Sequence, residues 1–61
     1  MHSVSVFNRE TMKYEVIKGG ICDMDEALSL AKKEAIERRC DIAIDMLITV
    51  DEFGRATCDF E

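Results

Sequence analysis

The sequence predicts an α+β domain in which one helix packs on an antiparallel sheet of about four strands, in the order β-β-α-β-β. Alternating apolar and polar residues indicate one strand pair before residue 19 and another after residue 40. Between them lies a stretch of helix-forming residues without glycine or proline. With 61 residues, the chain is expected to form one domain, 1–61, too small for a deep active-site cleft.

The first strand pair is predicted from the alternation at each side of a polar break. Val4 and Val6 alternate with serines, residues 8–10 interrupt the pattern, and a second strand runs from Met12 to Lys18. The glycine pair that follows ends the second strand and lets the chain turn towards a helix.

The helix is expected from Met24 to about Arg39. Asp23 is the expected N-cap, and Glu26 follows three residues later, as in a capping box. The helix face expected to cover the sheet consists of Met24, Ala27, Leu28, Ala31 and Ala35. Arg38 and Arg39 would complement the negative end of the helix dipole. The alternative, contact with nucleic acid, is disfavoured by a net charge of −5.

A long strand over residues 41–50 and a final hairpin are expected after the helix. Asp51-Glu52-Phe53-Gly54 predicts a tight turn with glycine in the left-handed conformation. With Asp51 opposite Arg55, the expected helix-facing pairs are Val50 with Ala56, Ile48 with Cys58, and Met46 with Phe60. The expected outward pairs are Thr49 with Thr57, Leu47 with Asp59, and Asp45 with Glu61.

The negative charge lies almost entirely in this last third of the chain. Residues 1–39 hold seven acids and seven bases, whereas residues 40–61 hold six acids and a single base, Arg55. A fixed acidic surface is a plausible docking site for a basic partner. The candidate partner-binding residues are Asp41, Asp45, Asp51, Glu52, Phe53, Asp59 and Glu61.

Three further features of the sequence allow two interpretations each. Phe53 either anchors a partner from the hairpin tip or folds back over the end of the helix and sheet. The like charges of Asp45 and Glu61 either mark a frayed C-terminus or belong to an acidic surface kept for a partner. Phe7, Ile17 and Leu47, expected on the sheet face away from the helix, are either ordinary surface residues or a strip for homodimerisation.

The sequence offers little reactive chemistry, and we expect no enzymatic activity and no cofactor. It contains neither a nucleophile motif nor a glycine-rich phosphate loop. A divalent metal could in principle be held by the acids at the helix start, Asp23, Asp25 and Glu26. Their order does not match that of a twelve-residue calcium loop, so no metal is expected. The three cysteines are expected to be reduced and mostly buried. His2 is expected to lie at a frayed terminus.

The chain contains no apolar run long enough for a membrane span and begins without the pattern of a signal peptide. We therefore expect a cytoplasmic protein that does not bind membranes. Its expected partner is a basic nucleic-acid-binding protein, not nucleic acid itself.

This acidic domain, with one helix on a small antiparallel sheet, resembles the small anti-CRISPR proteins of phages and other mobile elements. The layout from Lys13 through the helix to the C-terminal hairpin is similar to some that inhibit type I systems. The resemblance implies an inhibitor whose carboxylates stand in for DNA phosphates on a Cas effector complex and block its DNA-binding site. Phe53 would then be a central contact.

A second resemblance is confined to the helix. The runs Asp25-Glu26-Ala27-Leu28 and Ala31-Lys32-Lys33-Glu34-Ala35-Ile36 are similar to the helix of HicB-type antitoxins. That family would imply neutralisation of an RNA-cleaving toxin. The chain departs from it in having a long hairpin after the helix and no DNA-binding extension. A small homodimeric assembly module is the third interpretation, with the acidity serving solubility.

Overall fold

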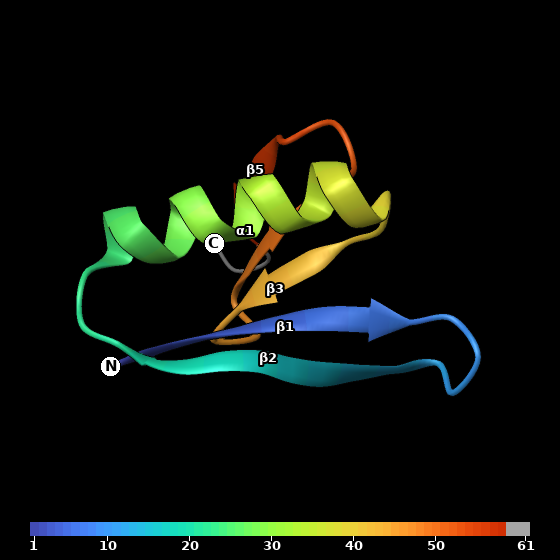
Figure 1. The fold of residues 1–61 in the computed structure, drawn as a ribbon, viewed down its shortest axis with the longest axis horizontal. Helices are drawn as coiled ribbons and strands as arrows, with labels where there is room; N and C mark the ends of the chain where they lie inside the picture. Colours follow the sequence, from blue (N-terminus) through green and yellow to red (C-terminus); the bar gives the residue numbers. More distant parts are fainter. Residues whose placement is uncertain (59–61) are drawn as a thin grey trace.

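A computed structural model describes residues 1–58 and confirms the α+β class, with one strand more than expected. Helix α1 (Met24–Arg38) lies across one face of a five-stranded antiparallel sheet (Figure 1). The strands are β1 (His2–Asn8), β2 (Lys13–Ile21), β3 (Ile42–Ile44), β4 (Ile48–Val50) and β5 (Ala56–Cys58). Their order in the sheet is β2-β1-β3-β4-β5, so β1 pairs with β3 and joins the two halves of the chain.

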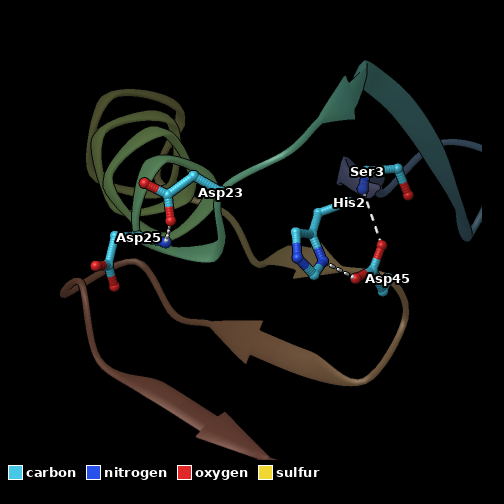
Figure 2. Close-up of polar contacts among 5 residues, drawn as sticks. All are labelled: His2, Ser3, Asp23, Asp25 and Asp45. Atoms are coloured by element: carbon cyan, nitrogen blue, oxygen red, sulfur yellow. Dashed lines mark hydrogen bonds and ion pairs between the residues drawn. The ribbon is translucent and has the colours of Figure 1, made fainter.

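Helix α1 begins and ends close to the expected residues. The Asp23 side chain accepts a hydrogen bond from the Asp25 amide at 3.1 Å, which satisfies one of the free N–H groups of the first turn (Figure 2). At the other end, Arg39 adopts the left-handed conformation, with φ 53° and ψ 46°, and stops the helix. Glu34 and Arg38, one turn apart, form an ion pair at 2.7 Å.

The core lies between the alanine face of α1 and the centre of the sheet. Ala27, Ala31 and Ala35 are completely buried, and their small side chains let the helix backbone lie close to the strands. The largest fully buried side chains are those of Val4, Ile42, Ile44 and Val50. Strands β1, β3 and β4 therefore supply most of the core surface under the helix.

The expected direction of Ile17 is wrong, because the first hairpin contains a β-bulge. The register skips between the pairs Val4 with Lys18 and Ser5 with Val16, so Ile17 packs against the core instead of facing away from the helix. Phe7 does lie on the far face, where its ring meets that of Tyr14 edge-on at 5.2 Å. The expected apolar strip of Phe7, Ile17 and Leu47 is not formed.

The expected single strand over residues 41–50 is wrong, because the segment folds into a hairpin of β3 and β4. Asp45 and Met46 adopt positive φ angles of 52° and 59°, and the Leu47 amide donates to the Ile44 carbonyl at 2.9 Å. This bond closes a tight turn over residues 45–47, and Ile44 pairs directly with Ile48. The physical reason is contact with β1, which pairs with β3 and binds the Asp45 side chain through His2 and Ser3.

The register of the last hairpin is confirmed where the structure describes it. Val50 pairs with Ala56, Thr49 with Thr57, and Ile48 with Cys58. The pairs expected for Asp59, Phe60 and Glu61 lie outside the described residues. Their expected partners, Asp45, Met46 and Leu47, belong to the turn between β3 and β4 and not to a strand.

Candidate functional site

The described candidate residues lie at two opposite ends of strands β3 and β4. Asp41 comes directly before β3, and Asp51, Glu52 and Phe53 follow β4, so the antiparallel pairing brings these four to one end. Asp45 lies at the other end, in the turn between the two strands. Asp59 and Glu61 lie outside the described residues. The five described candidates therefore do not share one end of the sheet.

Asp51 organises the turn that follows β4. Its carboxylate accepts hydrogen bonds from the Phe53 amide at 3.0 Å and from the Arg55 amide at 2.9 Å. The Asp51 amide donates to the Arg55 carbonyl, and the Gly54 amide donates to the Asp51 carbonyl, both at 2.9 Å. Gly54 has φ 83°, the left-handed conformation expected for this glycine. Asp51 is half-buried, and both hydrogen bonds to its carboxylate stabilise the turn.

Phe53 projects from this turn and is 77% exposed. The turn lies against the last part of α1, since a Cβ on Gly54 would come within 3.2 Å of the Ile36 Cδ1 atom. Ile36 is itself 54% exposed. We call the surface formed by Ile36, Asp51, Glu52, Phe53 and Gly54 the aromatic tip. It presents apolar side chains next to carboxylates instead of burying them.

Three carboxylates lie in or beside the aromatic tip, those of Asp41, Asp51 and Glu52. Glu52 is exposed, and Asp41 lies one step beyond the last β3–β4 pair, beside Asp51. Arg55, the only base of the last third, closes the turn opposite Asp51. An apolar anchor beside carboxylates is complementary to an apolar pocket with a basic rim.

Asp45 binds the start of β1 (Figure 2). Its carboxylate contacts the His2 Nδ1 atom at 2.6 Å and accepts a hydrogen bond from the Ser3 amide at 2.8 Å. The Asp45 amide donates to the Ser3 carbonyl at 2.9 Å. The hydrogen bond from His2, followed by that from Ser3, lowers the pKa of the Asp45 carboxyl below its usual value.

The expectation of a frayed N-terminus at His2 is therefore wrong. His2 is the first residue of β1, pairs with Ile21, and contacts a carboxylate 43 positions away along the chain. Sequence reasoning missed this contact because no local pattern links the two residues. The only hint of the contact in the sequence is that a single histidine in an acidic chain has many carboxylates with which it could pair.

The cysteines are less buried than expected. All three are free, but Cys22 and Cys58 are exposed and Cys40 is half-buried, so the expectation of mostly buried thiols is wrong. Within residues 1–58, no group of three histidine, cysteine, aspartate or glutamate side chains is placed to hold a metal ion. In the same residues, no helix is long and apolar enough to cross a membrane.

Comparison with known proteins gives no relative. No family model matches the chain, and neither a curated protein nor a solved structure is significantly similar to it. The site must be interpreted from its own geometry.

Proposed function

We propose that this protein is a non-enzymatic inhibitor that binds a basic protein through the aromatic tip. The observation that carries the proposal is the exposure of Phe53. A chain of 61 residues with three phenylalanines, one tyrosine and no tryptophan has few large side chains for its core, yet it leaves this one 77% exposed. Large aromatic residues that dock into a partner pocket dominate the energy of many interfaces.

The charge of the tip supports a basic partner. Glu52, the neighbour of Phe53 in the chain, and Asp41, one step beyond the last β3–β4 pair, are exposed. Within the described residues, both are free of the hydrogen bonds that occupy Asp51 and Asp45. Carboxylates at the rim of an interface attract a basic partner over distances of about 10 Å at moderate salt and exclude acidic ones.

In its most specific form, the proposal is an anti-CRISPR protein that occupies the DNA-binding site of a type I Cas effector complex. Such a site is lined by lysine and arginine, because it must hold DNA phosphates. We assign the leading roles to Phe53, Glu52 and Asp41, and secondary roles to Asp51 and Asp45, whose carboxylates already hold turns together.

The direct test measures whether purified type I effector complexes bind target DNA in the presence of the protein. We expect the wild type to prevent DNA binding and Phe53→Ala to be at least about tenfold less potent, in line with the loss of a central aromatic contact. Leu47→Ala is the matched control, because Leu47 is 50% exposed at the opposite end of β4. It should inhibit as well as the wild type.

Two results would contradict the proposal at different levels. If the wild type leaves DNA binding by every tested effector unchanged, the anti-CRISPR assignment is wrong. If the wild type inhibits but Phe53→Ala and Leu47→Ala are equally potent, the aromatic tip is not the contact surface.

A further inference from the structure

A second surface, distinct from the aromatic tip, gathers most of the arginines of the chain. The β1–β2 hairpin runs past the end of α1 (Figure 1). Residues of this hairpin and of the helix end line a groove of about 350 Å³. Arg9 lines it from the turn after β1, and Arg38 and Arg39 line it from the end of α1. Three of the four arginines thus meet in one groove of an acidic protein, whereas no lysine lines it.

Hydrogen bonds and ion pairs at the helix end do not engage all three arginines. Arg9 already caps the helix, because its Nη2 atom donates to the Arg39 carbonyl at 3.1 Å. Arg38 is paired with Glu34 at 2.7 Å. Within residues 1–58, no group accepts a hydrogen bond from the Arg39 guanidinium, and the Arg9 guanidinium uses one of its five donors.

We propose that this groove binds a single phosphate group of a small phosphorylated ligand, held between the guanidinium groups of Arg9 and Arg39. Two guanidinium groups from different elements offer more N–H donors than a carboxylate can accept, whereas a phosphate group has three terminal oxygens for them. The Arg9 guanidinium is held by its bond to the helix end, so less freedom is lost on binding. The groove volume leaves space for the organic part of a phosphate monoester.

Two carboxylates restrict what can enter. Glu10 and Glu15 also line the groove, and the Glu15 carboxylate accepts a hydrogen bond from the Asn8 side-chain Nδ2 atom at 3.2 Å. A single phosphate at the arginines brings one anionic group near these carboxylates, whereas a nucleic-acid backbone would carry further phosphates past both and towards the rest of an acidic molecule. The groove therefore favours a compact monoester over a polyanion.

The test follows backbone and arginine side-chain NMR signals during titration with inorganic phosphate and with phosphoserine, at constant ionic strength. Sodium chloride in place of the phosphate is the reference. We expect saturable shifts confined to the groove residues with both phosphate probes, and none with chloride. Saturation by phosphoserine alone would assign the groove to phosphorylated amino-acid ligands, while similar saturation by both would assign it to the phosphate group as such.

The phosphate affinities of variants distinguish a specific site in the groove from general attraction of phosphate to positive charge. Arg39→Gln should weaken phosphate binding at least about tenfold, because it removes one of the two guanidinium groups. Glu10→Gln should tighten it several-fold by removing a repulsive charge. Arg55→Gln is the matched control, since it removes an equal charge outside the groove, and it should leave the affinity unchanged.

Three outcomes would overturn the proposal. One is the absence of saturable shifts, and another is an equal effect of chloride. The third is an equal loss of affinity in Arg39→Gln and Arg55→Gln. Because Arg39→Gln removes no described contact of the fold, its folded spectrum provides the check that binding and not folding was changed.

Discussion

The two turns at the ends of β4 are built in different ways. The turn after β4 closes within five consecutive residues, 51–55. The Asp51 amide donates to the Arg55 carbonyl, and the Arg55 amide donates to the Asp51 carboxylate. The turn before β4 is held from far along the chain, because Asp45 is bound by His2 and Ser3. The first turn is closed only by bonds among neighbouring residues, whereas the second combines one local bond, from the Leu47 amide to the Ile44 carbonyl, with bonds to β1, which pairs with β3.

This difference separates the acidic residues by role. Asp45 and Asp51 each accept two hydrogen bonds that hold a turn together, so their carboxylates serve the fold. Glu52 and Asp41 have no such task among the described residues, and with Phe53 they remain available to a partner. The substitutions below test whether the two turns respond as differently as their contacts suggest.

Gly54→Ala should produce the largest loss of stability. It places a Cβ at φ 83° and within 3.2 Å of Ile36, and we expect a loss of about 1–3 kcal/mol in the free energy of unfolding. Urea denaturation measures it. Gly19→Ala is the control, because a Cβ there would have nothing within 4 Å. Equal effects of the two substitutions would show that the turn does not need its left-handed residue.

Asp51→Ala should come next, with a loss of about 1 kcal/mol, because two amides of the turn lose their acceptor. The neighbouring Glu52→Ala, at an exposed position, should change the free energy of unfolding by less than about 0.5 kcal/mol. Thermal or urea unfolding of both variants makes the comparison. If Glu52→Ala were the more damaging of the two, the assignment of fold and partner roles to these acids would be reversed.

Asp45→Asn should have a smaller effect that depends on pH. Because the folded protein lowers the pKa of Asp45, the ionised carboxylate stabilises the fold above the pKa of the unfolded chain, about 3.9. This contribution is lost as pH falls through the lower, folded value. The wild type should therefore exceed Asp45→Asn in stability at neutral pH, and the two should converge in acid.

The control for this comparison is Asp41→Asn, which removes the same charge at an exposed position on the other end of β3. His2→Ala should reproduce part of the Asp45→Asn effect, and the double variant should lose less than the sum of the two. A difference between wild type and Asp45→Asn that persists unchanged at low pH would contradict the assigned role of the carboxylate.

The sequence predicted the local features of the fold well. The helix ends, the alanine face and the turn at residues 51–54 each depend on residues close together in the chain, and all were confirmed. The missed turn at residues 45–47 has a simple explanation. With three loop residues between paired Ile44 and Ile48, the apolar residues keep the same alternation whether the segment runs straight or folds back. The folded-back form gains the contacts of Asp45 with His2 and Ser3 on β1, which the alternation does not reveal.

The candidate sites show the same limit. The exposure of Phe53 depends on how the hairpin meets α1 near Ile36, which no local pattern specifies. The arginine groove joins Arg9 to residues 30 positions away, so Arg38 and Arg39 could be interpreted from the sequence only as helix caps. The Asp45 contact to His2 spans 43 positions and was not predictable from spacing.

Urea denaturation of Phe53→Ala beside the wild type shows whether the Phe53 side chain serves a partner or the core. If Phe53 is kept for a partner and not for the core, the free energy of unfolding should change by less than about 0.5 kcal/mol. A loss of about 3–5 kcal/mol, the usual cost of removing a buried phenylalanine, would show that Phe53 belongs to the core. That result would contradict the aromatic tip as a binding surface.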